Sequence, residues 1–170
     1  MNADKEEFIN SIEEYKGIIN KISFAYTNNT DDRNDLKQEI LIQLWKSYPK
    51  FNHKSKLSTW IYRVALNTAI SNLRKVKRKI HEVELSEKHY QIPDPDNKSE
   101  CDDNLKKLYE LIYRLNDMER AIVLLYLEDQ SYSEIAGIVG ISETNVATKL
   151  GRIKLKLKNQ FGNKEDNHGS

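Results

Sequence analysis

The sequence predicts an all-α protein made of two small helical domains joined by a flexible acidic linker. Apolar residues recur at steps of three and four along most of the 170 residues, which is the period of one helix face. The apolar, β-branched runs that a sheet needs are missing, and glycine and proline are scarce, at six and three residues. Each half of the chain has its own helical pattern, so we expect two separate cores.

The amino-terminal domain is predicted over residues 1–79. Its first helix should run from 4 to 26, because one apolar stripe continues through that range at helical spacing. The stripe consists of Phe8, Ile12, Tyr15, Ile19 and Ile22. A turn-rich break follows at 27–35, where Asp31 or Asp32 can cap the next helix.

Two further helices complete this domain. The second continues the apolar pattern to Trp45, which we expect on its buried stripe, and Pro49 disfavours helix at the residue before it. Ser58 or Thr59 can cap the third helix, which is long. That helix should end in the run RKVKRK at 74–79, which has five cations in six positions.

The charges are segregated, although the net charge is only +1. The basic run at 74–79 is followed by 81–103, which holds eight acids, two lysines and two prolines and has no sustained apolar period. This composition predicts a solvated linker at 80–103. A second basic run follows at 149–158, with five cations and no acid. Such segregation is compatible with a nucleic-acid partner, which a near-zero mean charge would hide.

The carboxy-terminal domain is predicted over 104–162, and the tail 163–170 should be disordered. A helix is expected at 105–115 from its leucine and isoleucine spacing. A second helix should begin at Asn116 or Asp117.

The last two helices of this domain have the pattern of a helix-turn-helix. Ser131 stands three residues before Glu134, the spacing of a capping box. Ala136 is small enough for close helix approach, and Gly140 can take the left-handed conformation that ends the first helix. Ser142 can cap the second helix, whose inward face should be Val146, Leu150 and Ile153.

The outward face of that second helix is polar and basic, which suits a helix lying in the major groove of DNA. Its residues are Glu143, Thr144, Asn145, Thr148, Lys149 and Arg152. A plain surface helix, with lysines near its end for the helix dipole and solubility, would have a similar pattern.

A second candidate nucleic-acid surface lies on the long helix of the first domain. Trp60, Tyr62, Arg63 and Asn67 fall within two turns, ahead of the basic run. Aromatic faces stack on unpaired bases and cations hold phosphates, so the set suits a single strand. Equally, Trp60 could be a core residue and the basic run a solvated helix end.

Other classes of function have no support in the composition. The single cysteine excludes an internal disulfide, and the four histidines lack the spacing of a metal site. We expect no catalytic chemistry, metal or cofactor. The amino terminus lacks a signal-peptide pattern, and no apolar run approaches the roughly 18–20 residues that span a bilayer, so we expect a cytoplasmic protein without membrane insertion.

Two blocks of sequence resemble the extracytoplasmic-function group of the sigma-70 family of RNA polymerase sigma factors. DRNDLKQEILIQLWKSYPKF at 32–51 and KLSTWIYRVALNTAISNLRK at 56–75 are similar to domain two of that family. The segment 116–158 is similar to domain four, in the order that the family has. The resemblance implies a two-domain initiation factor that binds core polymerase, through the β′ coiled coil and the β flap, and promoter DNA. It also implies an anti-sigma factor or another regulatory or recruiting partner.

The resemblance assigns roles in the first domain. The family's D-L-x-Q-E helix docks on the β′ coiled coil, and the matching residues are Asp35, Leu36, Gln38, Glu39 and Ile42. The family's S-T-W helix binds the minus-10 element and traps a flipped base. For the pocket, the matching residues are Phe51, Val64 and Asn67, together with His53 and Lys56 of the loop. For strand melting they are Trp60 and Arg63. For contact with the DNA backbone they are Arg74, Lys75 and Arg78.

In the second domain the resemblance assigns the outward face of the last helix, Glu143 to Arg152, to the minus-35 element. Ala147 stands where the family often has a cation, and Gly151 where a bulkier residue is common. We therefore expect weak minus-35 binding. The alternative function is an autonomous helix-turn-helix regulator that does not bind polymerase. An enzyme acting on nucleic acid would need a carboxylate or histidine cluster that the sequence lacks.

Overall fold

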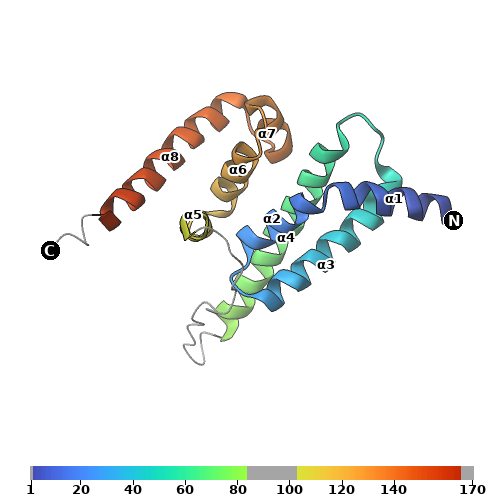
Figure 1. Ribbon diagram of the computed structural model, residues 1–170, viewed down its shortest axis with the longest axis horizontal. Coiled ribbons are helices and arrows are strands. Elements are labelled where there is room, and N and C mark those ends of the chain that lie inside the picture. Colours follow the sequence, from blue (N-terminus) through green and yellow to red (C-terminus); the bar gives the residue numbers. More distant parts are fainter. Residues whose placement is uncertain (1, 84–102, 166–170) are drawn as a thin grey trace. The chain divides into compact units, whose positions relative to one another are not determined.

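The computed structural model describes residues 2–83 and 103–165. All regular elements in these two ranges are helices, as Figure 1 shows. The chain divides into two compact units, Met1–Glu100 and Cys101–Ser170. The predicted all-α class with two helical domains is confirmed. Most of the predicted linker, at 84–102, lies outside the described residues.

Unit 1 is built on three helices that pack against one another, α2, α3 and α4, with α1 added at the amino-terminal end. Its elements are α1 (Asn2–Glu14), α2 (Lys16–Tyr26), α3 (Thr30–Ser47), the 3-10 turn η1 (Tyr48–Lys50) and α4 (Leu57–Val83). The centre of the core consists of Ile22, Leu36, Ile40, Leu44 and Ile61, each at most 2% exposed. Burying each such side chain contributes about 1.5–3 kcal/mol, so this apolar contact holds the three helices together.

The prediction of one helix over 4–26 is wrong, because the chain breaks at Tyr15. The backbone of Tyr15 has φ −105° and ψ 13°, and its N–H donates to the Ile12 carbonyl at 3.1 Å in a tight turn. The helix restarts when the Ile18 N–H donates to the Tyr15 carbonyl at 3.0 Å. Gly17, a weak helix former, follows the break. Both segments bury apolar side chains, Phe8 and Ile12 before the break and Ile18, Ile19 and Ile22 after it.

The predicted caps of α3 are also wrong. Asn29 is the cap, and its side-chain oxygen accepts from the Asp32 N–H at 2.8 Å. Asp31 and Asp32 instead lie in the first helical turn, where carboxylates favour the positive end of the helix dipole.

The long helix α4 starts earlier and ends later than predicted. It begins at Leu57, so Ser58 and Thr59 lie inside its first turn and are not caps. It also continues through 80–83, which were predicted to belong to the linker. Helix-forming lysine and arginine residues in the basic run favour this continuation.

The described part of unit 2, residues 103–165, contains four helices, three of which, α6, α7 and α8, pack on one another. Its elements are α5 (Asp103–Tyr113), α6 (Asp117–Leu127), α7 (Tyr132–Val139) and α8 (Glu143–Glu165). Asn116 caps α6 as predicted, since its side chain accepts from the Glu119 N–H at 2.9 Å. The predicted tail at 163–170 is wrong at its start, because α8 continues to Glu165, and the remainder lies outside the described residues.

A buried arginine closes the turn between α5 and α6. Arg120 is 3% exposed, and its guanidinium donates to the carbonyls of Tyr113 and Leu115, the latter at 3.1 Å. The same group lies 4.8 Å from the Tyr113 ring centroid. It therefore satisfies carbonyls that the end of α5 leaves without helical partners.

A buried hydroxyl gives a prediction about stability. Ser23, in α2, is fully buried, and its hydroxyl has no hydrogen-bond partner among the described residues. Ser23→Ala should raise the free energy of unfolding of unit 1 by about 1 kcal/mol, because alanine removes an unsatisfied polar group and is the better helix former. Urea unfolding followed by tryptophan fluorescence measures this. Ser71→Ala, at an exposed position in α4, controls for helix propensity, and a loss of stability in Ser23→Ala would contradict the prediction.

Candidate nucleic-acid interface

The outer face of α3 presents most of the residues that were predicted to dock on the polymerase. Asp35, Gln38 and Ile42 are exposed, and Glu39 is half-buried. Leu36 is only 1% exposed, so it belongs to the core and cannot contact a partner. Its prediction as a docking residue is wrong, because a motif match does not distinguish the inward residue of a helix from its outward neighbours.

An apolar patch on the same helix was not predicted. Leu41, Ile42 and Trp45 are exposed to 38%, 45% and 45%. The expectation that Trp45 is buried is wrong. Trp45 follows Leu44 and is therefore rotated by about 100° away from the buried stripe. Its ring instead meets Phe8 of α1, with the ring centroids 5.0 Å apart.

A polar groove of about 520 Å³ runs between α3 and α4. Its lining residues are Asp35, Glu39, Gln43, Asn67, Thr68, Ser71, Asn72 and Lys75. Within it, the Gln43 amide donates to the Glu39 carboxylate at 2.8 Å. The groove thus brings Asn67 and Lys75, predicted to touch DNA, together with two carboxylates predicted to touch polymerase. Spacing along the sequence could not show that these two sets share one groove.

The residues of the predicted base pocket have different neighbours in the structure. Phe51 packs against Trp60 and His53, with centroids at 5.1 Å and 4.5 Å, beside the loop that precedes α4. Asn67 lies with α3 in the groove instead, and neither Phe51 nor Val64 lines that groove. The loop has one special conformation, at His53, whose φ of 57° lies in the left-handed region.

Trp60 is half-buried, so it is not a fully buried core residue. Its ring contacts those of Tyr48 and Phe51, with the ring centroids 6.2 Å and 5.1 Å apart. Tyr62 is 5% exposed and belongs to the core, so the expected aromatic pair is not a shared surface. Two residues are separated by about 200° around a helix, which places these rings on different faces.

The other predicted minus-10 residues follow the accessible side of α4 and its loop. Val64, one helical turn after Trp60, is half-buried. The exposed members are His53, Lys56, Arg63, Asn67, Arg74, Lys75 and Arg78. Arg63, Asn67 and Arg74 are spaced by four and seven residues, which keeps them in line along one face of α4. The arrangement offers cations and an amide along a line that starts at an accessible aromatic ring, as a single nucleic-acid strand requires.

The predicted helix-turn-helix is present between α7 and α8. The Ser131 hydroxyl accepts from the Glu134 N–H at 3.2 Å, and the Glu134 carboxylate accepts from the Ser131 N–H at 2.9 Å, which is a complete capping box. Gly140 has φ 81°, the left-handed conformation that was expected. The Ser142 hydroxyl accepts from the Asn145 N–H at 3.2 Å and caps α8. These predictions are confirmed.

The face of α8 that was expected to meet DNA points away from the core of unit 2. Val146, Leu150 and Ile153 are at most 1% exposed, as predicted. Lys149 is half-buried, and the exposed residues are Glu143, Thr144, Asn145, Thr148 and Arg152. The first turns of α8 therefore present polar side chains for base edges, and two cations follow them.

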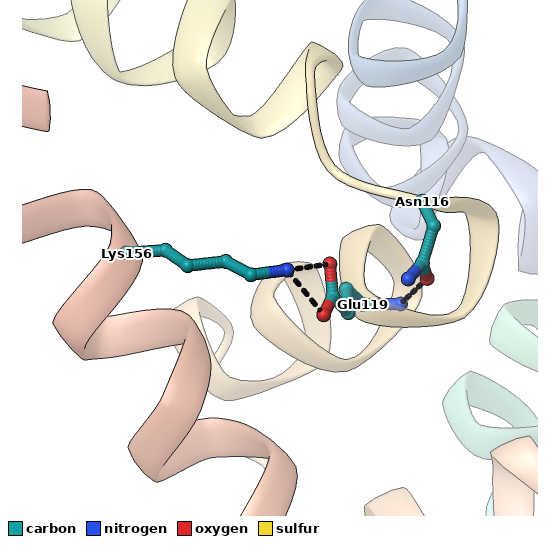
Figure 2. A network of polar contacts seen from close by, with 3 residues as sticks. All are labelled: Asn116, Glu119 and Lys156. Atoms are coloured by element: carbon teal, nitrogen blue, oxygen red, sulfur yellow. Dashed lines mark hydrogen bonds and ion pairs between the residues drawn. The ribbon is translucent and has the colours of Figure 1, made fainter.

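The later cations of α8 bind within unit 2, which was not predicted. Figure 2 shows Lys156 donating to both carboxylate oxygens of Glu119, at 2.8 Å and 3.0 Å. The Glu119 N–H in turn donates to the Asn116 side chain, so the backbone of Glu119 is fixed at the start of α6. Lys154 donates to the Tyr126 hydroxyl at 3.0 Å, a hydrogen bond that raises the pKa of Lys154 above its usual value. These contacts orient α8 against α6.

The Glu119 contact predicts a salt-sensitive loss of stability. Glu119→Gln should lower the free energy of unfolding of unit 2 by about 0.5–1 kcal/mol at low salt, because it removes an ion pair whose lysine is half exposed and a favourable helix-start charge. The difference should shrink in 1 M salt, where the Debye length falls to about 3 Å. Thermal unfolding by circular dichroism measures it, with Glu110→Gln, exposed in α5, as control. An equal difference at both salt concentrations would point to packing instead.

Among the described residues no group of three or more histidine, cysteine or acidic side chains is placed to hold a metal ion. None of the described helices combines the length and the apolar character that crossing a bilayer requires.

Comparison with known proteins matches each unit to one family segment. Residues 12–79 match sigma-70 region 2, and residues 105–157 match sigma-70 region 4. The RNA polymerase sigma factor SigV of Bacillus subtilis is 30% identical over 95% of both chains. The ECF RNA polymerase sigma factor SigW of the same organism is 27% identical over 94% of this chain and 91% of the relative.

Solved structures with the same fold have lower sequence identity. The sigma factor RpoE of Bartonella quintana, solved in complex with the anti-sigma factor NepR, has a TM-score of 0.71 and 18% identity, over 95% of this chain and 98% of that one. CnrH, solved with the cytosolic domain of CnrY, has a TM-score of 0.66 and 18% identity, over 93% and 89%.

Proposed function

The chain belongs to the extracytoplasmic-function group of the sigma-70 family of RNA polymerase sigma factors, and we propose a division of its work between the two units. As a sigma factor it binds core polymerase, recognises promoter DNA and supports transcription initiation. The observation that carries this function is that regions 2 and 4 of the family match the chain in order, one in each unit.

In unit 1, α3 is the element that docks on core polymerase, at the β′ coiled coil. Asp35, Gln38 and Glu39 offer a polar, acidic edge to a basic partner helix, and the exposed side chain of Ile42 adds apolar contact. Charged rims fix orientation and speed association, whereas a buried apolar centre supplies most of the affinity. The acidic edge and the apolar patch lie on one helix, which supports a single docking face.

In the same unit, α4 and its loop bind the minus-10 element and hold the strands apart. Trp60 stacks on an unpaired base, with Phe51 and His53 beside it. Arg63 lies where the two DNA strands begin to separate. Asn67 offers a base-reading amide, while Arg74, Lys75 and Arg78 hold phosphates. The half-buried state of Trp60 supports this role, because a stacking ring must be both anchored and accessible.

In unit 2, the first half of α8 binds the minus-35 element in the major groove. Thr144, Asn145 and Thr148 contact base edges, and Lys149 and Arg152 contact phosphate or guanine. Glu143 lies at the start of the helix, where it is suited to accept from a cytosine amine. Binding by this helix is weak, because Ala147 and Gly151 offer no cation and Lys154 and Lys156 bind Tyr126 and Glu119.

Sigma factors are initiation factors rather than enzymes, and this chain has no catalytic activity of its own. It acts in the cytoplasm, where its polymerase and promoter partners are. The functional segments are 1–79 and 104–162, with 80–103 between them. A further protein partner regulates or recruits the factor. The anti-sigma factor NepR binds RpoE, and a counterpart of NepR would bind this chain. The β flap of polymerase is a second contact, through unit 2.

A reconstituted transcription assay tests the function. The chain and core polymerase are combined with a library of duplex promoters, and promoter-specific transcripts are expected. Ile42→Glu should abolish them and weaken polymerase binding by about tenfold or more, because it places a charge in an apolar contact. Leu127→Glu, at an exposed position of α6, is the control for an added surface charge. DNA binding without polymerase and without transcripts would instead indicate an autonomous regulator.

A further inference from the structure

A continuous chain of aromatic rings connects the first helix of unit 1 to the loop in front of α4. Consecutive ring centroids lie 4.5–6.2 Å apart, the range of favourable aromatic pairs. The pairs are Phe8–Tyr48 at 5.1 Å, Tyr48–Trp60 at 6.2 Å, Trp60–Phe51 at 5.1 Å and Phe51–His53 at 4.5 Å. The chain thus begins on α1 and ends at the surface proposed to open DNA.

The α1 end of this chain is anchored. Phe8 is 7% exposed and meets Trp45 and Tyr48 edge-on, at interplanar angles of 66° and 67°. The Tyr48 hydroxyl donates to the Glu7 carboxylate at 3.4 Å. Both Glu7 and Phe8 precede the segment that matches region 2, which starts at residue 12. Their role is therefore not given by the family match.

The geometry of Trp60 explains why such support matters. Its ring has Phe51 as one neighbour and Tyr48 as another, at an edge-on angle of 62° to Tyr48. A ring that stacks on an unpaired base must keep its orientation against the tendency of the base to return to the duplex. Tyr48 can resist rotation of Trp60 only if Tyr48 is itself fixed. Phe8, through its ring, and Glu7, through its carboxylate, contact Tyr48 and supply that restraint.

We propose that Phe8 is a positioning residue for promoter opening, acting through Tyr48 on the orientation of Trp60. It does not touch DNA or polymerase. The inference rests on the proposed role of α4 in opening the minus-10 element. It assigns to α1 a part in strand separation that is independent of the docking face on α3.

A spectroscopic test uses the fact that the chain has only two tryptophans, Trp45 and Trp60. In a Trp45→Phe background, which keeps a ring beside Phe8, emission comes from Trp60 alone. Phe8→Leu in that background should increase quenching of Trp60 by iodide by about twofold, because the ring loses an indirect support. Ile9→Ala, next to Phe8 but 51% exposed, is the matched control and should leave quenching unchanged.

A functional test uses the holoenzyme. Phe8→Leu should slow opening of a duplex promoter by about fivefold to tenfold, the effect of losing an aromatic pair in the opening step. On a template already unpaired at the minus-10 element the loss should be within about twofold, since no base pair remains to be broken. Polymerase binding should equal that of the wild type.

Three results for Phe8→Leu would overturn the inference. They are iodide quenching of Trp60 equal to that of the wild type, promoter opening on duplex DNA equal to that of the wild type, or equal losses of activity on duplex and unpaired templates. Equal losses would mean general damage to unit 1. If circular dichroism shows that Phe8→Leu does not fold, Phe8→Met, which retains more of the buried volume, is subjected to the same tests and outcomes. A wild-type holoenzyme that makes no promoter-specific transcript would instead count against the proposed function.

Discussion

Trp60→Ala is expected to slow promoter opening on duplex DNA by about 10- to 100-fold. Stacking of one base on an aromatic side chain is worth about 1–3 kcal/mol, and this energy is gained only once the base has left the duplex. The variant also leaves Phe51 and Tyr48 without their shared neighbour. Opening is measured with a fluorescent base analogue in the minus-10 element, in holoenzyme at saturating polymerase.

The same experiment on an unpaired template separates opening from binding. We expect Trp60→Ala to recover most activity there, because the energetic cost of unpairing has been removed. Val76→Ala is the matched control, since Val76 is also on α4 and 40% exposed but lies away from the ring chain. Equal activity of Trp60→Ala and wild type on duplex DNA would exclude stacking by this ring.

The second large effect concerns the stability of unit 2. Arg120→Ala should destabilise this unit by about 3–5 kcal/mol, because it leaves buried carbonyls at the end of α5 without their donor and creates a cavity. Small domains have total stabilities of about 5–15 kcal/mol, so the unit should be partly unfolded at 37 °C. Arg120→Lys should recover only part of the loss, since an ammonium cannot reproduce the planar fork of a guanidinium.

The positions of the two tryptophans allow the unfolding of the two units to be measured separately. Both are in unit 1, so tryptophan fluorescence follows that unit alone, whereas circular dichroism follows all helices. Arg120→Ala should lower the midpoint of part of the dichroism transition and leave the fluorescence transition in place. Arg114→Ala, exposed at the end of α5, should change neither. A matching shift in fluorescence would mean that the two units unfold together.

Local patterns predicted much of the fold. The capping box at Ser131, the left-handed Gly140 and the cap at Ser142 depend on residues within a few positions of one another, so spacing is enough to identify them. The break at Tyr15 was missed because an apolar stripe remains periodic when a helix bends and restarts. Asn29 was missed as the α3 cap because nearby aspartates have the same propensity.

The candidate site was less predictable, because its key features are tertiary. The burial of Leu36 and the exposure of Trp45 follow from which face of α3 meets α2 and α4. The groove depends on residues of α3 and α4 that are 24 to 40 positions apart, and the Lys156–Glu119 pair on residues 37 positions apart. Motif similarity can assign a role to such residues but cannot show which of them share a surface.

The internal contacts of α8 also limit how many counterions this helix can displace from DNA. The run at 149–158 has five cations, but Lys154 and Lys156 already have partners in α6. Five cations less these two leave Lys149, Arg152 and Lys158, which could neutralise three phosphates, and each contributes a slope of about −0.9 in log affinity against log salt concentration. The slope for minus-35 recognition should then be near −3 rather than the −4 to −5 that the full run would produce. Attachment to DNA by this end of the factor would therefore vary less with the ionic strength of the cell than five free cations would make it.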